Sequence, residues 1–112
     1  ERDFLYVADA VDAYLAILDL LDAGVGFGEA FNVGSGVPVR ALEIVEAMCQ
    51  IAGVEPSADV RGTGVPEGEI SRHWIDSSKL HGLTGWEPRV GLEEGLALTL
   101  DWYREHPEIL AN

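Results

Sequence analysis

The stretches of this sequence that could form β-strands are few and short, and this limits the fold more than any other feature. Each is an apolar or mixed run bounded by charged, glycine or proline residues. They are residues 4–7, 30–33, 58–61 and 70–75. Helical patterns separate them, so the sequence predicts an α/β fold with three to four short strands and about four helices. We expect a single domain over residues 1–112 whose sheet is incomplete without further chain.

The first predicted helix covers residues 9–23, with Asp9 as its N-cap. Apolar residues recur there at i, i+3, i+4 and i+7 spacing, which is typical of a helix face that packs on a core. The stripe consists of Val11, Tyr14, Leu15, Leu18 and Leu21. The glycines at positions 24, 26 and 28 are expected to end this helix and to form a loop.

The other three helices are predicted over residues 39–52, 77–84 and 92–104. Gly53 and Gly85 are expected to stop the first two, and Asp76 or Ser77 to cap the short one. The inward residues of the 39–52 helix would be Leu42, Val45, Met48, Cys49 and Ala52. Those of the 92–104 helix would be Leu92, Leu96, Thr99, Leu100 and Tyr103.

Charge and composition exclude several classes of protein. The 112 residues include 20 acidic and 7 basic side chains, for a formal net charge of -13. Phosphate backbones repel such a chain, so nucleic acid and anionic membrane surfaces are not expected partners. No apolar run reaches the ~18 residues of a membrane span, and no signal-peptide pattern opens the chain. The single cysteine, Cys49, excludes an internal disulfide and fits a cytoplasmic location.

Familiar catalytic and metal-binding patterns are missing. Ser71, His73 and Asp76 cannot share one face of a strand, which argues against a nucleophilic triad. The three histidines are dispersed and lack zinc-site spacing. We therefore expect no catalytic residue and no metal ligand within this chain.

Several motifs follow one another at intervals along the chain. They are Arg2-Asp3-Phe4-Leu5-Tyr6-Val7, Phe31-Asn32-Val33-Gly34-Ser35-Gly36, Asp76-Ser77-Ser78-Lys79, Gly85-Trp86-Glu87-Pro88, and Leu92-Glu93-Glu94-Gly95-Leu96 with Trp102-Tyr103. In this order the chain resembles the C-terminal third of the NAD-dependent epimerase/dehydratase family, the extended short-chain dehydrogenases that rework nucleotide sugars. The resemblance implies a C-terminal substrate-binding segment, with the N-terminal Rossmann half absent from this chain.

The resemblance also implies an activity for the longer parent enzyme. The parent would bind NAD or NADP in its N-terminal half and oxidise the sugar at C4 with an upstream tyrosine and lysine. A nucleotide-sugar 4,6-dehydratase of the GDP-mannose or CDP-glucose type would then eliminate water across C5–C6. A UDP-sugar 4-epimerase would instead return the hydride to the other face of C4. In isolation, the chain could also be a non-catalytic packing or interaction module. We expect it to bind no cofactor itself.

Four residues are candidates for contact with the nucleotide sugar. The resemblance gives Arg2 a contact with the diphosphate, which suits a guanidinium that binds phosphate oxygens in pairs; otherwise Arg2 would be a solvated arginine paired with Asp3 or Asp9. The resemblance also implies a second arginine near residue 66, where this chain has Pro-Glu-Gly-Glu instead. Arg61 or Arg72 could take its place. Asn32 is the fourth candidate, with a turn-forming role as the alternative.

Two shorter patterns resemble particular classes of dehydratase within this family. Val39-Arg40 echoes the GDP-mannose 4,6-dehydratases, whereas Glu69-Ile70 followed by Trp74 echoes the CDP-glucose enzymes. The glycines around Ser35 precede a helix but lack the spacing of a phosphate-binding loop, which favours a simple turn.

Strands left without neighbours expose backbone edges and apolar faces, so we also expect a homodimer or another self-associated form.

Overall fold

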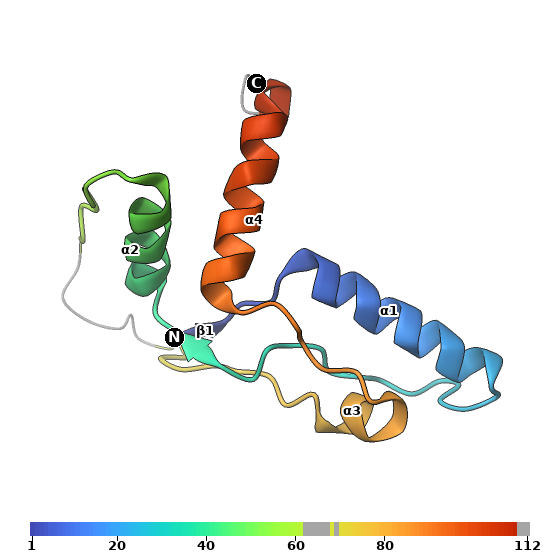
Figure 1. The fold of residues 1–112 in the computed structure, drawn as a ribbon. Coiled ribbons are helices and arrows are strands. Elements are labelled where there is room, and N and C mark those ends of the chain that lie inside the picture. The colour runs from blue at the N-terminus through green and yellow to red at the C-terminus, as the bar shows by residue number, and fades with distance from the viewer. Residues whose placement is uncertain (62–67, 69, 110–112) are drawn as a thin grey trace.

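The fold is organised around a short antiparallel ladder (Figure 1). The computed structural model describes residues 1–61, 68 and 70–109. Strand β1 (Arg2–Asp3) pairs with β2 (Pro38–Val39), and Arg2 lies opposite Val39. The ladder brings the start of the chain next to the segment that leads into the second helix.

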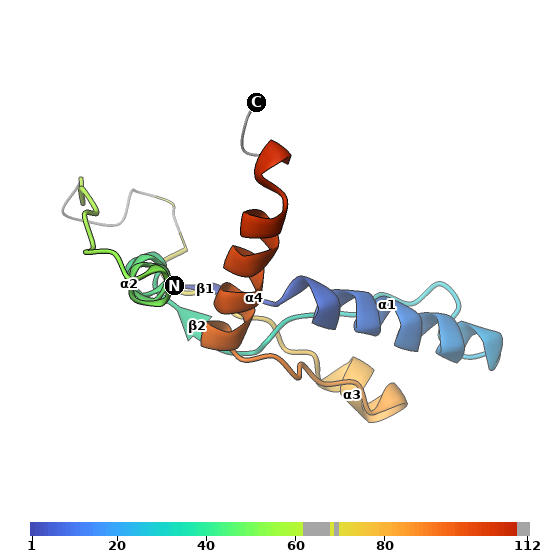
Figure 2. The same ribbon diagram turned by 45° about the horizontal axis from the view of Figure 1, so that its top comes forward.

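The described residues form four helices: α1 (Val7–Asp22), α2 (Ala41–Ala52), α3 (Ser78–Thr84) and α4 (Leu92–Glu105). A 3-10 turn, Pro107–Ile109, follows α4. Helix α1 lies against α3, and α2 lies against α4. Figures 1 and 2 show α1 and α4 leading away from the ladder in different directions, which gives the molecule an open outline.

The radius of gyration and the accessible surface area both show that the molecule is extended. The radius of gyration is 17.3 Å, against about 13 Å for a compact domain of this length. The accessible surface is 8353 Å², against roughly 6,000 Å² for a folded monomer of this size. The buried core is correspondingly small, since Ala13, Leu80 and Trp86 form it with a few half-buried neighbours. The chain therefore leaves exposed a large area that a compact domain would bury.

The strand predictions were largely wrong. Residues 30–33, 58–61 and 70–75 are not strands, and residues 4–7 run from the end of β1 into the first residue of α1. The ladder is the only sheet among the described residues. A strand needs a neighbour to accept and donate its backbone hydrogen bonds, and the described part of the chain supplies one such pair, two residues long. The four predicted helices are confirmed, and Gly53 and Gly85 end α2 and α3 in the left-handed conformation.

The apolar stripe of α1 faces away from the core, contrary to the prediction. Val11, Tyr14, Leu15 and Leu18 are 51%, 72%, 53% and 57% exposed. The opposite face, with Ala13, Ala16 and Ile17, is the one that packs on the core cluster. Helix α2 is similar, because Leu42, Val45 and Met48 are also exposed. The periodicity identified the helices correctly but could not show which surface covers their apolar faces.

Asp9 was predicted to cap α1, but it has a different role. The helix begins two residues earlier, with Tyr6 at the N-cap position. Asp9 is 2% exposed. Its carboxylate accepts hydrogen bonds from the amides of Arg89 and Val90, and its carbonyl accepts one from the indole of Trp86. One residue of α1 thus fixes the connection between α3 and α4.

Candidate functional site

Three arginines meet at one end of the ladder, and together we call them the arginine corner: Arg2, Arg40 and Arg72. Each contacts Glu1. The guanidinium of Arg72 lies 2.5 Å from one Glu1 carboxylate oxygen, and that of Arg40 lies 3.8 Å from the other. Arg2 donates to the carbonyls of Glu1 and Ile70, both at 2.8 Å. In a chain with a net charge of -13, this corner gathers three of the seven basic side chains.

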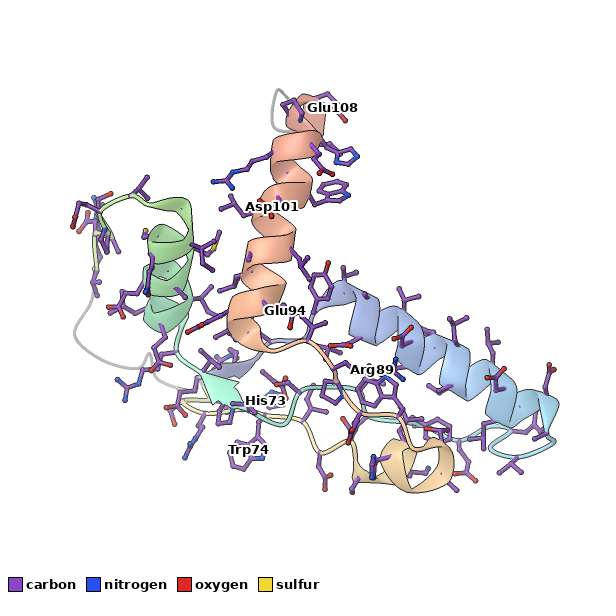
Figure 3. All side chains as sticks on the ribbon, viewed as in Figure 1. His73, Trp74, Arg89, Glu94, Asp101 and Glu108 are labelled. Carbon is purple, nitrogen blue, oxygen red and sulfur yellow. The ribbon has the colours of Figure 1, made fainter. Side chains whose placement is uncertain are left out.

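Three separate segments build the corner. Arg2 belongs to β1, and Arg40 follows β2 as the N-cap residue of α2. Arg72 comes from the irregular segment before α3, which the amide of His73 ties to the carbonyl of Glu1 at 3.1 Å. The guanidinium of Arg72 also lies 5.4 Å from the ring centre of Trp74. Figure 3 shows His73 and Trp74 on this side of the molecule, far from Asp101 on α4.

An apolar groove of about 640 Å³ borders the same ladder. Residues 4–7, the apolar side chains of Val37 and Val39, and the first turns of α4 line it. Val39 pairs with Arg2 and precedes Arg40, so the groove and the arginine corner share the β1–β2 ladder as a border. Ligand sites commonly combine an apolar cleft with a few charged groups at one side.

The glycine turn next to this groove binds an anion, but the anion belongs to the chain itself. The Asp3 carboxylate accepts hydrogen bonds from the amides of Ser35, Gly36 and Ile75 at 2.8–3.0 Å, and from the Ser35 hydroxyl at 2.6 Å. Partial burial alone would raise the pKa of the Asp3 carboxyl. The hydrogen bonds outweigh burial and hold the pKa below its ordinary value of 3.8.

Gly34 is required for this close approach. A Cβ at this position would lie 2.5 Å from the Cβ of Ile75 and 2.9 Å from an Asp3 carboxylate oxygen. The Ser77 hydroxyl lies on the same turn, where it accepts from the Gly34 amide and donates to the Gly34 carbonyl. Ser77 is therefore the N-cap residue of α3 only by position, and it is Asp76 that accepts from the Ser78 amide at 2.9 Å. The sequence prediction of a turn, rather than a phosphate loop, agrees with this arrangement.

The structure brings together two of the four predicted site residues and separates the other two from them. It brings Arg2 and Arg72 together at Glu1. Arg61 follows α2 and pairs with Asp59 at 2.6 Å, with its side chain 87% exposed. Asn32 is exposed on the connection between α1 and β2. Arg40 was noted from the sequence only as an echo of one enzyme class, and its position at the corner depends on the β1–β2 pairing.

Two negative findings apply to the described ranges, 1–61, 68 and 70–109. No helix there combines the length and the apolar character needed to cross a bilayer. The same residues hold no group of three or more histidine, cysteine or acidic side chains placed to bind a metal ion.

Comparison with known proteins finds similarity to enzymes of nucleotide-sugar metabolism. Residues 1–99 match the family model described as GDP-mannose 4,6 dehydratase. GDP-L-fucose synthase 1 of Arabidopsis thaliana is 40% identical over 102 residues, which cover 91% of this chain and 29% of that protein. A dTDP-glucose 4,6-dehydratase of Xanthomonas campestris is 34% identical over 110 residues, covering 91% and 30%. The chain thus spans about 30% of the length of these relatives.

Solved structures agree with the sequence relatives. The UDP-glucose 4-epimerase from Bifidobacterium longum, in complex with NAD+ and UDP, has the same fold over 94% of this chain, with a TM-score of 0.76 at 24% identity. RMD from Pseudomonas aeruginosa, complexed with NADPH, aligns over 85% with a TM-score of 0.66 at 33% identity. This chain covers 30% of each. The chain therefore belongs to the NAD-dependent epimerase/dehydratase family, the extended short-chain dehydrogenases, with residues 1–99 matching its model described as GDP-mannose 4,6 dehydratase.

Proposed function

We propose that this chain is the C-terminal, substrate-side part of a nucleotide-sugar 4,6-dehydratase of the GDP-mannose or CDP-glucose type. The arginine corner is the observation that supports this proposal most directly. Arg2 and Arg72 come from distant parts of the sequence and converge on Glu1: Arg72 pairs with its carboxylate, and Arg2 donates to its main-chain carbonyl. A guanidinium keeps its charge and offers several donors, so it suits a diphosphate. The family match over residues 1–99 supports a nucleotide sugar as the ligand class.

The surrounding surface fits the two halves of such a substrate. The diphosphate would replace the Glu1 carboxylate at the arginine corner. The sugar or the base would lie along the apolar groove of about 640 Å³ that borders the same ladder. The chain would then position the substrate and would not break bonds itself, since the expected catalytic tyrosine and lysine belong to the rest of the enzyme. A UDP-sugar 4-epimerase is the second candidate, because a UDP-bound epimerase shares the fold.

The described residues do not fit the cofactor. The glycine turn at residues 34–36 is the one place that resembles a phosphate loop, and the Asp3 carboxylate already accepts hydrogen bonds from its amides at Ser35 and Gly36. A pyrophosphate would have to displace a carboxylate held by four hydrogen bonds. We therefore assign NAD or NADP binding to the part of the enzyme outside this chain.

Replacing Arg2 or Arg72 by alanine in the full-length enzyme should raise KM for the nucleotide sugar by about tenfold or more. Each loss removes a charge-assisted contact worth ~1.5–3 kcal/mol. Affinity for NAD or NADP should not change. Steady-state kinetics with the GDP-, CDP- and UDP-linked sugars provide the measurement, and product analysis separates dehydration from epimerisation. Unchanged KM in both variants would contradict the proposed site.

The exposed apolar surface leads to a separate expectation about the isolated chain. The chain exposes roughly 2,300 Å² more than a compact monomer would, which exceeds the ~800 Å² that each partner contributes to an ordinary interface. We propose that the isolated chain self-associates through the α1 stripe, and that Leu15→Lys on this stripe returns it to a monomer. Added salt should strengthen association by screening the negative charge. Sedimentation at several salt concentrations tests this, and a monomer at all concentrations would contradict it.

A further inference from the structure

We infer that Arg40 is a third diphosphate-binding arginine, kept at the N-cap of α2 although it weakens that helix. This inference rests on the proposed function, because it extends the same site by one residue. The sequence gives Arg40 no motif of its own beyond the echo noted above. Three observations carry the inference: the position of Arg40 on the helix, the weakness of its present contacts, and its place at the arginine corner.

The N-cap is an unfavourable position for arginine. This position favours serine, threonine, aspartate or asparagine, whose short side chains accept a hydrogen bond from the first-turn amides. Arg40 has the extended N-cap backbone, with φ -78° and ψ 145°, yet its side chain makes no capping bond. Its positive charge also lies at the end of the helix where the macrodipole disfavours cations. A residue that breaks a local rule in this way often serves a function.

The present contacts of Arg40 do not compensate for these losses. Its guanidinium lies 3.5 Å from Glu43 and 3.8 Å from Glu1, both longer than a good hydrogen bond. The side chain is 71% exposed, and ion pairs so exposed add little to stability. Nothing in the packing of α2 therefore accounts for an arginine at this position.

The position of Arg40 at the arginine corner explains the presence of an arginine at the N-cap of α2. Glu1 extends one carboxylate oxygen to Arg40 and the other to Arg72, so a single small anion already bridges the two guanidiniums. A diphosphate carries more oxygens and more charge than a carboxylate, and could therefore draw in all three arginines. The pairing of Arg2 with Val39 holds β1 beside the residue that precedes Arg40. The ladder thus sets the distance between the first and third arginines.

The test is Arg40→Ser in the full-length enzyme, since serine is a preferred N-cap residue. We expect KM for the nucleotide sugar to rise about tenfold while kcat stays unchanged. Amide hydrogen exchange in the first turn of α2 should become slower. Arg40→Lys should recover part of the affinity for the nucleotide sugar, because lysine restores the positive charge but lacks the planar set of guanidinium N–H donors. The matched control is Arg104→Ser, since Arg104 is an exposed arginine in a comparable i, i+3 pair with Asp101, near the C-terminal end of α4 that points away from the ladder (Figure 1).

The outcomes separate this inference from the function on which it rests. If Arg2→Ala and Arg72→Ala raise KM and Arg40→Ser does not, the inference is wrong and the proposed function stands. If none of the three variants raises KM, the proposed site fails as well. A higher KM accompanied by faster exchange in α2 would mean that Arg40→Ser acts by loosening the helix, which also overturns the inference. An equal effect of Arg104→Ser would do the same.

Discussion

Replacing Asp9 by alanine should lower the free energy of unfolding of the chain by about 3–5 kcal/mol. Asp9 is almost fully buried, and its two carboxylate oxygens accept from the amides of Arg89 and Val90 at 3.0–3.1 Å. The alanine variant leaves both amides without their charged acceptor. It also loosens the connection that holds Trp86 over α1. Urea unfolding followed by circular dichroism measures the change.

Asp12→Ala is the matched control for this experiment. Asp12 lies on the same helix, less than one turn away, but it is exposed. Its replacement should change the free energy of unfolding by less than about 0.5 kcal/mol. If the two variants lose equal stability, the effect of Asp9 would come from helix charge and not from the buried hydrogen bonds.

Replacing Asp3 by asparagine should destabilise the chain by about 2 kcal/mol near neutral pH. The carboxylate joins β1, the glycine turn and the segment at Ile75 through four hydrogen bonds. An asparagine places an NH2 group against at least one of these donors. The loss should depend on pH, because the pKa of Asp3 in the folded chain lies below 3.8.

The direction of this dependence follows from the lowered pKa. The folded chain holds the Asp3 proton less tightly than the unfolded chain, so the stabilisation is fully present above pH 3.8 and is lost as pH falls through the folded pKa. The stability difference between the wild type and Asp3→Asn should therefore shrink in that acid range. Asp19→Asn, an exposed substitution on α1, should show no such convergence. A difference that is constant with pH would mean that the ionised carboxylate is not the stabilising form.

The sequence predicted local structure well wherever local chemistry decides it. The four helices and the glycine stops at positions 53 and 85 are confirmed, because periodicity and left-handed glycines act within a few residues. The family was also recognised from motifs that the comparisons confirm. Arg2 and Arg72 were both named as candidates before the fold placed them together.

Features that depend on distant partners could not be predicted in the same way. The predicted strands lacked neighbours in the described part of the chain, and the apolar stripe of α1 turned outward because the core formed on its alanine side. Asp9 resembled a helix cap because its true partners are 80 and 81 residues away. For a similar reason, the sequence indicated Arg40 only as part of a family pattern and not as a site residue. Its proximity to Arg2 and Arg72 arises from the ladder and from Glu1.

The three tryptophans of the chain lie in different environments. The Trp86 indole donates a hydrogen bond to the Asp9 carbonyl. Trp86 lies in the buried core, whereas Trp74, in the segment before α3, and Trp102, on α4, are exposed. We therefore expect Trp86 to emit from an apolar environment, and Trp74 and Trp102 from more hydrated ones. Trp74 also lies next to the guanidinium of Arg72, so we expect its emission to change when an anion displaces Glu1 from that arginine. We therefore expect tryptophan emission to follow the integrity of the core through Trp86 and ligand binding at the proposed arginine corner through Trp74.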